Sequence, residues 1–498
     1  MSEGTVLQRE DSRRRNVVSR TGKWARTNAG AGVVLVVMAA VEWFAMRHGT
    51  LGLLAGITAA GLAVILVVTS FDLIRLALGT SLVASFTLSW NGVFFGPVRP
   101  GDVLALLAVL MFILGNDGKH LPRVPFWIWQ LVVGIVLVVA LNLIFPPSDR
   151  FVAGRTIIQL NGKTAISLKS DFVSANLFTG VKFIIAIAVV PAMLAFAALY
   201  RREYARRLIV LFAVGAGLSG WVAILAKYGL NTINLFIGTH GGHGTRQIGL
   251  ANQPNYLAAG VVIAVPIGMW LLVEPDRWSR WLGAFTVSGC VFGAYASGSR
   301  GGSVTIVGAV GLSMLLIPRV RKFIFPSFLV TATTIVALFL FAPSSVSAIG
   351  ATTRLFGNAA SHVTGYSDLE RTILSDQAMR DFYYSPIHGI GLQVSFDAQT
   401  VYFQILQSGG ILLMITLMLY YFASIFVSFR MIPRYSLAAA LCSSVVASLV
   451  LDVFEADLTD RFYYVPIGAI LALKLADEWR SPDEPADPDQ FAALGAAR

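Results

Sequence analysis

The side chains of this chain that point most directly to chemistry are arginines placed beside glycines and small polar residues. Arg246 precedes Pro254 and Asn255, which begin a long apolar run. Arg300 follows Ser299 in the polar turn Ser-Gly-Ser-Arg-Gly-Gly-Ser, between two apolar runs. A helix that begins at such a turn presents backbone N–H groups to an anion, and a guanidinium adds parallel donors that match phosphate oxygens. These two segments therefore predict anion-binding sites.

Each cation also has a structural interpretation that needs no ligand. Arg300 could extend its charged head from an apolar environment to water, and Arg246 could adjoin a helix start that Pro254 and Asn255 form. Lys182, near one end of another apolar run, is a further candidate for contact with phosphate. Arg300 lies at the external end of its apolar runs, where the positive-inside rule requires no cation, which favours the anion-binding interpretation.

The longest polar stretch, residues 342–411, contains Arg371, His388 and Asp397. Its apolar residues between 369 and 382 recur at helical spacing, and Tyr-Tyr-Ser-Pro and Gly-Ile-Gly add turn signals. We therefore expect folded structure here, although a solvated connector is the alternative. In structural terms, Asp397 could cap a helix and His388 could be a turn histidine without a catalytic role.

The elements that must position these residues are membrane-spanning helices. Of the 498 residues, 56% are hydrophobic and 13% are charged, against about 25% charged residues in soluble domains. We expect an all-α polytopic membrane protein of about 12–14 transmembrane helices, with a large extracytoplasmic loop before a late helix. The expected spans are residues 29–46, 51–70, 73–90, 101–115, 126–146, 177–199, 208–226, 255–273, 281–297, 302–317, 323–342, 399–428, 435–452 and 461–476.

The charge distribution predicts the orientation of these spans. The net charge of +11 comes mainly from short basic clusters between apolar runs, as expected of cytoplasmic loops, so we exclude a nucleic-acid partner. An Asn161-Gly162 pair between alternating runs predicts a hairpin in an external loop. The expected division is a basic cytoplasmic tail at 1–28, a transmembrane domain at 29–476 with external loops at 147–176 and 343–398, and a disordered cytoplasmic tail at 477–498.

Three of these segments together resemble the superfamily of O-antigen ligases and O-antigen polymerases, which are bacterial envelope glycosyltransferases. The resemblance covers roughly residues 240–430, and it depends on the order of the motifs and their placement relative to the spans. The late span that follows, with Gly-Gly-Ile at 409–411, also fits. The matching positions are Arg246, Gly249, Pro254, Asn255 and Ala258, then Ser299, Arg300 and Gly301, then Arg371, Ser385, Pro386, Gly389 and Gly391.

This resemblance implies a reaction on lipid-linked glycans outside the bacterial cytoplasmic membrane. An acceptor hydroxyl attacks the anomeric carbon of a glycan carried on undecaprenyl pyrophosphate, and the pyrophosphate lipid leaves. Arginines neutralise the charge that develops on the leaving group. The resemblance implies no metal and no cofactor. The partners are the glycan donor, a glycan acceptor and membrane lipid, and a chain-length regulator or a flippase would be further protein partners.

The residues expected to act in this reaction follow from the same resemblance. The ligases place a His-Asn pair at the start of the span after the long loop, whereas this chain has Phe-Asp-Ala-Gln-Thr there. Asp397 is therefore the first candidate for the general base and His388 the second, with Arg371 as a further catalytic residue. Arg300, Arg246, Asn255, Ser299 and Lys182 are the residues expected to bind pyrophosphate or substrate.

Three functions remain open on the sequence. The leading one is polymerisation of lipid-linked repeat units into a cell-surface or secreted polysaccharide. The second is ligase-like transfer of a glycan to a lipid or protein acceptor, and the third is transport of a lipid-linked oligosaccharide. A transporter would carry its polar site near mid-membrane, which the external arginines disfavour. Residues 239–244, Thr-His-Gly-Gly-His-Gly, have too few ligands for a metal site.

Overall fold

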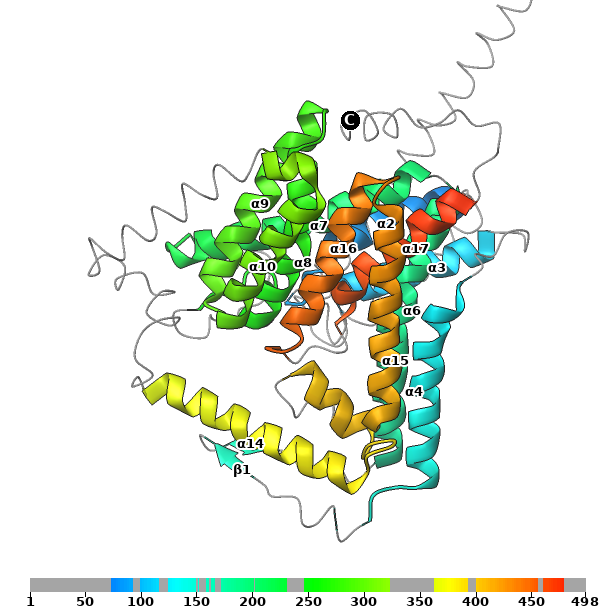
Figure 1. The fold of residues 1–498 in the computed structure, drawn as a ribbon, viewed down its shortest axis with the longest axis vertical. Coiled ribbons are helices and arrows are strands. Elements are labelled where there is room, and N and C mark those ends of the chain that lie inside the picture. Colours follow the sequence, from blue (N-terminus) through cyan, green and yellow to red (C-terminus); the bar gives the residue numbers. More distant parts are fainter. Residues whose placement is uncertain are drawn as a thin grey trace, which may run out of the picture.

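The computed structural model is a bundle of helices that run back and forth between two ends (Figure 1). Its core elements follow the apolar runs of the sequence. The structure describes residues 73–92, 99–115, 124–148, 151, 158–160, 163–165, 172–200, 202–230, 246–322, 362–392, 400–455 and 460–478. The helices are α2 Leu73–Thr87, α3 Pro100–Gly115, α4 Phe126–Ile144, α6 Phe172–Tyr200, α7 Arg202–Lys227, α8 Pro254–Leu272, α9 Arg277–Ser297, α10 Arg300–Leu316, α14 His362–Tyr384, α15 Val401–Met431, α16 Ser436–Leu451 and α17 Val465–Glu478.

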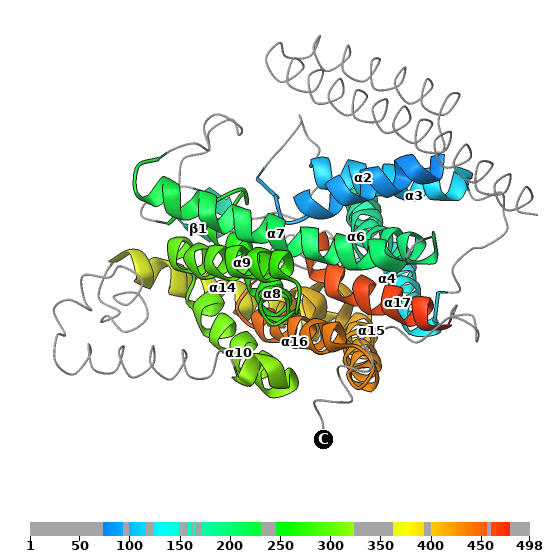
Figure 2. The same cartoon turned by 90° about the horizontal axis from the view of Figure 1, so that it is seen from above.

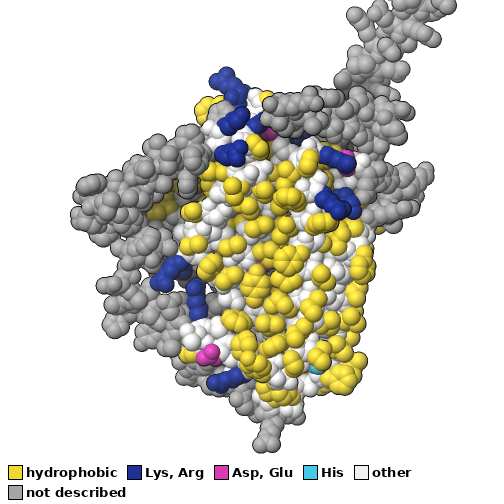
Figure 3. Space-filling view, viewed as in Figure 1, with side chains coloured by type: hydrophobic (Ala, Val, Ile, Leu, Met, Phe, Trp, Pro, Cys, Tyr) yellow, Lys and Arg dark blue, Asp and Glu magenta, His cyan; other side chains and the backbone are white. Residues whose placement is uncertain are grey.

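The length and composition of these helices fit a membrane protein. Among the described residues, five helices are long and apolar enough to cross a membrane, namely α4, α6, α7, α8 and α15. Four shorter apolar helices accompany them. Large apolar side chains stay exposed on the outer surface, and they form a broad hydrophobic face over α10, α16, α15 and α4 with Lys and Arg near its upper margin (Figure 3). An α-helix suits lipid because it satisfies its own backbone hydrogen bonds.

Small residues bring the central helices close together. Figure 2 shows α7 between α2 and α9, and α8 lies between α9 and α16. A Cβ atom added to Gly220 of α7 would clash with the carbonyl oxygen of Gly289 in α9, and one added to Gly293 would meet Gly220. Glycines spaced four residues apart let the helix backbones approach closely. The resulting van der Waals packing holds the helices together in lipid, where there is no hydrophobic driving force between them. The result is a rigid centre in which α8 is almost completely buried.

One end of the bundle collects helix termini that are far apart in the sequence. The backbone N–H of Gly92 donates to Leu250 O at 2.8 Å, and that of Val401 donates to Asp452 O at 3.0 Å. The end of α2, the starts of α8 and α15 and the end of α16 therefore lie together. We call this the first end.

The opposite end, the second end, carries many basic side chains. Arg206 at the start of α7 pairs with Glu274 after α8 at 2.7 Å. Trp270 of α8 donates to Ser436 Oγ at the start of α16 at 2.9 Å. The helices thus alternate in direction along the chain, which is the arrangement that the hydropathy pattern predicts.

The long polar stretch before α15 contains helix α14, which lies crosswise beneath the first end in Figure 1. Buried Asp381 of α14 accepts hydrogen bonds from Gln377 at 2.9 Å and from Gln407 of α15 at 2.7 Å. This carboxylate therefore joins α14 to α15. The prediction of folded structure in this stretch is confirmed for its described residues.

Helix α15 is broken at Gly410, whose backbone has φ 60° and ψ −159°. The loop after α14 docks at the break. Ile390 N donates to Gln407 O at 2.9 Å, and Ile411 N donates to Pro386 O at 2.8 Å. The loop thus replaces hydrogen bonds that the break removes from the helix.

The predicted boundaries need several corrections. Helix α6 begins at Phe172 and not at 177, and the predicted span 461–476 is divided between a 3-10 helix, Arg461–Tyr464, and α17. Because α17 ends at Glu478, the first two residues of the predicted C-terminal tail are helical. Strands β1 Ile158–Leu160 and β2 Lys163–Ala165 pair antiparallel around the predicted Asn-Gly turn. The expected spans 29–46, 51–70 and 323–342, the tail 1–28 and the rest of the C-terminal tail lie outside the described residues.

Candidate active site

The centre of the candidate site is Glu455, a carboxylate buried at the first end. It follows α16 in a short turn and is only 4% exposed. Ser299 Oγ donates a hydrogen bond to Glu455 Oε1 over 3.1 Å. The side chain of Asn255, near the start of α8, gives a second hydrogen bond. A buried carboxylate that receives two hydrogen bonds is held in a fixed orientation.

Arg246 supports Asn255 from the segment that leads into α8. Its Nε donates to Ser297 O at 2.8 Å, and its Nη2 donates to Asn255 Oδ1. Because the amide oxygen of Asn255 accepts from Arg246, the amide nitrogen is the donor to Glu455. Arg246 therefore links the end of α9 to the start of α8 and orients a donor toward the carboxylate.

The start of α10 explains the Ser-Arg-Gly-Gly sequence. Ser299 caps the helix, and its Oγ accepts from Gly302 N at 3.2 Å while it donates to Glu455. A Cβ atom on Gly302 would lie 2.5 Å from Ala258 Cβ of α8, and one on Gly301 would clash with Phe454. The two glycines therefore let α10 pack directly against α8 and against the turn that carries Glu455.

Two arginines act on Glu455 through their charge. Burial raises the pKa of Glu455 to about 7, and the positive charges of Arg371 on α14 and of Arg246 oppose this effect of burial. A carboxyl group with a pKa near neutrality can take up and release a proton at the pH of a living cell. We call Glu455, Ser299, Asn255, Arg246 and Arg371 the Glu455 group.

Arg300 lies beside this group as the first residue of α10, and it is exposed. The Glu455 group thus includes four of the residues predicted from the sequence, and Arg300 is next to Ser299. The start of α15 is tied to the same place, because Val401 N donates to both Asp452 O and Glu455 O at 3.0 Å. Asp397, the first candidate for the base, lies outside the described residues.

His388, the second candidate for the base, lies in a different place. Its carbonyl oxygen accepts from Asn142 Nδ2 of α4 at 2.9 Å, and its ring centroid is 6.3 Å from that of Phe145. Ser385 Oγ lies 3.4 Å from its ring nitrogens. These described contacts join His388 to α4 and to its own loop, and none of them joins it to the Glu455 group.

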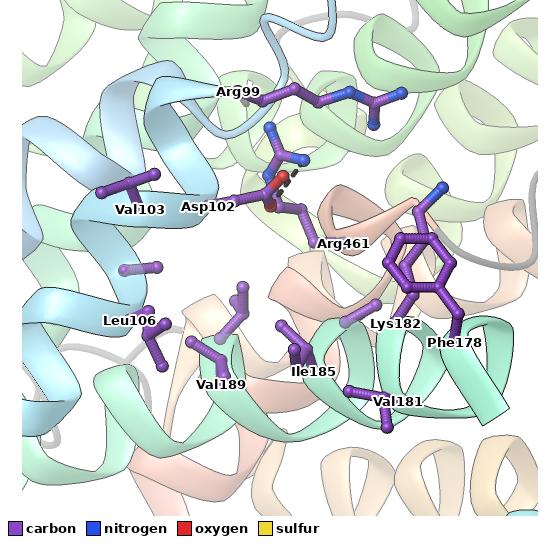
Figure 4. Close-up of a pocket in the computed structure, with 13 residues that line it drawn as sticks. Arg99, Asp102, Val103, Leu106, Phe178, Val181, Lys182, Ile185, Val189 and Arg461 are labelled. Atoms are coloured by element: carbon purple, nitrogen blue, oxygen red, sulfur yellow. Dashed lines mark ion pairs between the residues drawn. The ribbon is translucent and has the colours of Figure 1, made fainter. Parts of the chain in front are cut away.

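Lys182 is also separate from the Glu455 group. It lines a pocket of about 440 Å³ between α3 and α6, together with Arg99, Asp102 and Arg461 (Figure 4). The structure therefore divides the described residues of the predicted site among three places: the Glu455 group, the loop of His388 and this pocket.

Glu455 is the residue of the site that sequence reasoning missed. A usable signal is present in the sequence, because Asp452 and Glu455 are two carboxylates at the end of a predicted span, on the side where the motif arginines lie. Among the described residues, no group of three or more His, Cys, Asp or Glu side chains could hold a metal ion.

Comparison with known proteins adds no family to this picture. No family model matches the sequence, and no curated protein matches it significantly. The resemblance to the O-antigen ligases and polymerases therefore stays a prediction. A functional assignment has to rest on the residues and their geometry.

Proposed function

We propose that this protein polymerises oligosaccharide repeat units that are linked to undecaprenyl pyrophosphate, on the extracytoplasmic face of the bacterial cytoplasmic membrane. The observation that carries the proposal is Glu455, a buried carboxyl group with a pKa of about 7 on which the positive charges of two arginines act. The pairing of a proton acceptor with fixed positive charge suits the transfer of a glycan from a pyrophosphate leaving group.

In the proposed reaction, Glu455 is the general base. It removes the proton from an acceptor hydroxyl while the hydroxyl oxygen attacks the anomeric carbon of the donor. The bond between that carbon and the pyrophosphate oxygen breaks, and its electron pair leaves with the lipid pyrophosphate. Attack from the face opposite the leaving group inverts the configuration at the anomeric carbon. The reaction needs no metal, since Arg246, Arg371 and Arg300 offer positive charge at the same end of the bundle.

Asn255 and Ser299 have positioning roles in this proposal. Both donate hydrogen bonds to Glu455, so they hold the carboxylate and limit how far burial raises its pKa. Asp397 remains a prediction for the base.

The charge distribution supports the proposed orientation. Both ends carry arginines. At the second end, Arg206, Arg207 and Arg434 belong to short basic clusters between apolar runs. At the first end, arginines lie with the carboxylates Asp452, Glu455 and Asp460. Under the positive-inside rule, the second end faces the cytoplasm and the Glu455 group faces outside. The same rule applied to the whole sequence supports about 12–14 transmembrane helices with α14 in the large external loop.

Ligase-like transfer to a lipid or protein acceptor would use the same carboxylate and arginines, so the two reactions differ in the acceptor. A transporter of lipid-linked oligosaccharide would need its polar site near the middle of the membrane. The Glu455 group lies instead where helices end, which favours an enzyme.

The test is the Glu455→Gln variant in a strain that lacks its own copy of the gene. Glutamine keeps the size and can still accept from Ser299, but it cannot take a proton. Loss of a general base lowers a rate by about 10²–10⁴-fold, so we expect high-molecular-weight glycan to disappear from a gel of surface and secreted polysaccharide. Glu203→Gln is the matched control, because Glu203 is exposed at the second end and pairs with Arg207 one turn along the same helix.

The glycan that accumulates separates the three functions. Single repeat units delivered outside indicate a polymerase, and chains of normal length left on the carrier lipid indicate a ligase. Repeat units retained on the cytoplasmic side would indicate a transporter and would contradict the proposal. Normal polymer from Glu455→Gln, with the protein present in the membrane, would also contradict the role of this carboxylate.

A further inference from the structure

A second polar site at the first end is a pocket between α3 and α6, and it is not part of the Glu455 group. It is a pocket of about 440 Å³ whose walls differ in kind. Arg99, Lys182 and Arg461 mark one region, and apolar side chains such as Val103 and Ile185 mark the other (Figure 4). Three separate elements supply the cations, since Arg99 precedes α3, Lys182 is on α6 and Arg461 begins the 3-10 helix.

Arg461 is the most informative residue of the pocket. Its side chain is only 4% exposed, and its Nη1 pairs with Asp102 Oδ1 at 2.6 Å. Its Nε and Nη2 are buried and have no hydrogen-bond partner in the part of the chain that the structure describes. A buried donor without a partner is costly, on the order of 1–3 kcal/mol and more for a charged group. A ligand with negatively charged oxygens would satisfy both nitrogens, because a guanidinium binds phosphate through parallel N–H groups.

The charges around the pocket also favour an anion. Asp102 pairs with Arg461, and Asp460 pairs with Arg99 at 2.7 Å. Asn91 Nδ2 donates to Asp460 at 2.6 Å. Lys182 is a third cation among the described residues that line the pocket.

The apolar walls indicate that the anion belongs to a lipid. Five apolar residues line the pocket and yet remain 38–73% exposed, namely Val103 and Leu106 of α3 and Phe178, Val181 and Ile185 of α6. Such side chains on a membrane protein border hydrocarbon. A chain could therefore lie along α3 and α6 while its headgroup reaches the cations. A free sugar phosphate or a free ion would gain nothing from these walls.

We propose that the pocket between α3 and α6 binds a phosphate-bearing membrane lipid, with its phosphate on Arg461 and Lys182 and its hydrocarbon chain against Leu106 and Ile185. The phosphate could be that of a polyprenyl phosphate or of a glycerophospholipid, and both have the chemistry that the pocket recognises. The inference does not depend on the proposed function, because it requires no reaction at Glu455.

The test measures lipid binding to the purified full-length protein in detergent by native mass spectrometry. The probes are undecaprenyl phosphate, phosphatidylglycerol and inorganic phosphate, each added alone. Lys182→Met removes one cation, and Leu106→Trp fills the apolar part of the pocket. Their matched controls are Arg207→Met, an exposed cation at the second end, and Leu110→Trp, an exposed position on α3 that does not line the pocket. Arg461→Met is less suitable, because it also removes the ion-pair partner of Asp102.

We expect Lys182→Met and Leu106→Trp each to weaken the binding of at least one lipid by about tenfold, with both controls unchanged. Selective loss for undecaprenyl phosphate identifies a polyprenyl ligand, and selective loss for phosphatidylglycerol identifies a glycerophospholipid. Lipid binding that neither variant changes would overturn the proposal. The lipid assignment would be overturned if inorganic phosphate bound as tightly as the lipids and Leu106→Trp did not affect its binding. Glu455→Gln should bind lipid normally, so failure of the proposed enzymatic function would be seen separately.

Discussion

A single buried carboxyl group explains most of the chemistry expected at the residue scale. Burial raises the pKa of Glu455 and so favours its protonated form, which cannot act as a base. Arg371, Arg246 and two hydrogen bonds oppose burial and leave the pKa at about 7. Glu455 therefore becomes a competent base as the pH rises through this value.

This balance predicts the pH dependence of the reaction. The rate of glycan transfer by the purified protein should rise as the pH increases through about 7, because a larger fraction of Glu455 is deprotonated. Arg371→Ala removes a positive charge that lowers the pKa of Glu455, so the midpoint should move to higher pH and the rate near neutrality should fall. Initial rates measured across this pH range check both expectations.

The control for this prediction is Arg380→Ala, which removes an exposed arginine from the same helix, α14. Its pH profile should match that of the unchanged protein. Arg371→Ala could instead lower the rate without moving the midpoint of the pH–rate profile. That result would mean that Arg371 contacts substrate without setting the protonation of Glu455.

At the scale of elements, hydropathy predicts the helices that face lipid but not the way in which they break. Hydropathy predicted the bounds of α4 and α8 and the end of α7 to within a few residues, whereas α7 begins earlier than predicted. The prediction succeeds because apolar segments in lipid must satisfy their own backbone groups. The break in α15 was not predictable in this way. Gly409 and Gly410 lie in an apolar run that a continuous helix would also fit, and the break depends on a loop that docks from outside the helix.

The residues of the site that were predicted differ from the one that was missed in how far along the sequence their partners lie. Arg246 and Ser299 belong to local motifs, so their sequence neighbours identify them. Glu455 has no such neighbours, because its burial and its pKa depend on side chains from α8, α10 and α14. Partners that are distant in sequence decide whether a carboxylate at the end of a span becomes a solvated helix terminus or a buried base.

The break in α15 gives a prediction about stability. Gly410 has a positive φ, and a Cβ atom there would lie 2.5 Å from the carbonyl of Ile387 and 2.6 Å from Pro386 O. Gly410→Ala should therefore displace the docked loop and lower the melting temperature of the purified protein, since strained backbone of this kind costs about 1–3 kcal/mol. Differential scanning fluorimetry in detergent is a suitable measurement.

Gly308→Ala is the matched control. Gly308 lies within α10 with no atom near the position of an added Cβ, so alanine should be neutral or slightly stabilising there. A melting temperature that falls equally in both variants would show that loop docking at the break does not matter for stability.

At the scale of the whole molecule, the two ends differ in charge and should face different compartments. Tyr383 on α14 is 73% exposed near the first end, and the side chain of Glu203 is 81% exposed at the second end. Cys290 and Cys442 are both buried, so the native thiols give little background. In spheroplasts, a membrane-impermeant maleimide should label Tyr383→Cys, whereas Glu203→Cys should react only after lysis.

The reverse labelling pattern would place the Glu455 group in the cytoplasm. It would contradict both the orientation and the proposed reaction, because the donor glycan is used outside the membrane. Equal labelling of both positions before lysis would indicate damaged spheroplasts, which a cytoplasmic marker enzyme released into the medium detects.

The position of Glu455 after the arginines in the sequence has a consequence for biosynthesis. A ribosome makes Arg246, Ser299 and Arg371 well before it makes residue 455 of the 498, and chains begin to fold during synthesis from the N-terminal side. A partly inserted chain therefore already carries the arginines and the helix starts but still lacks the proton acceptor. Under the proposed function, the protein can become reactive toward a lipid-linked substrate only after residue 455 has been made, so shorter translation products would be inert in the membrane.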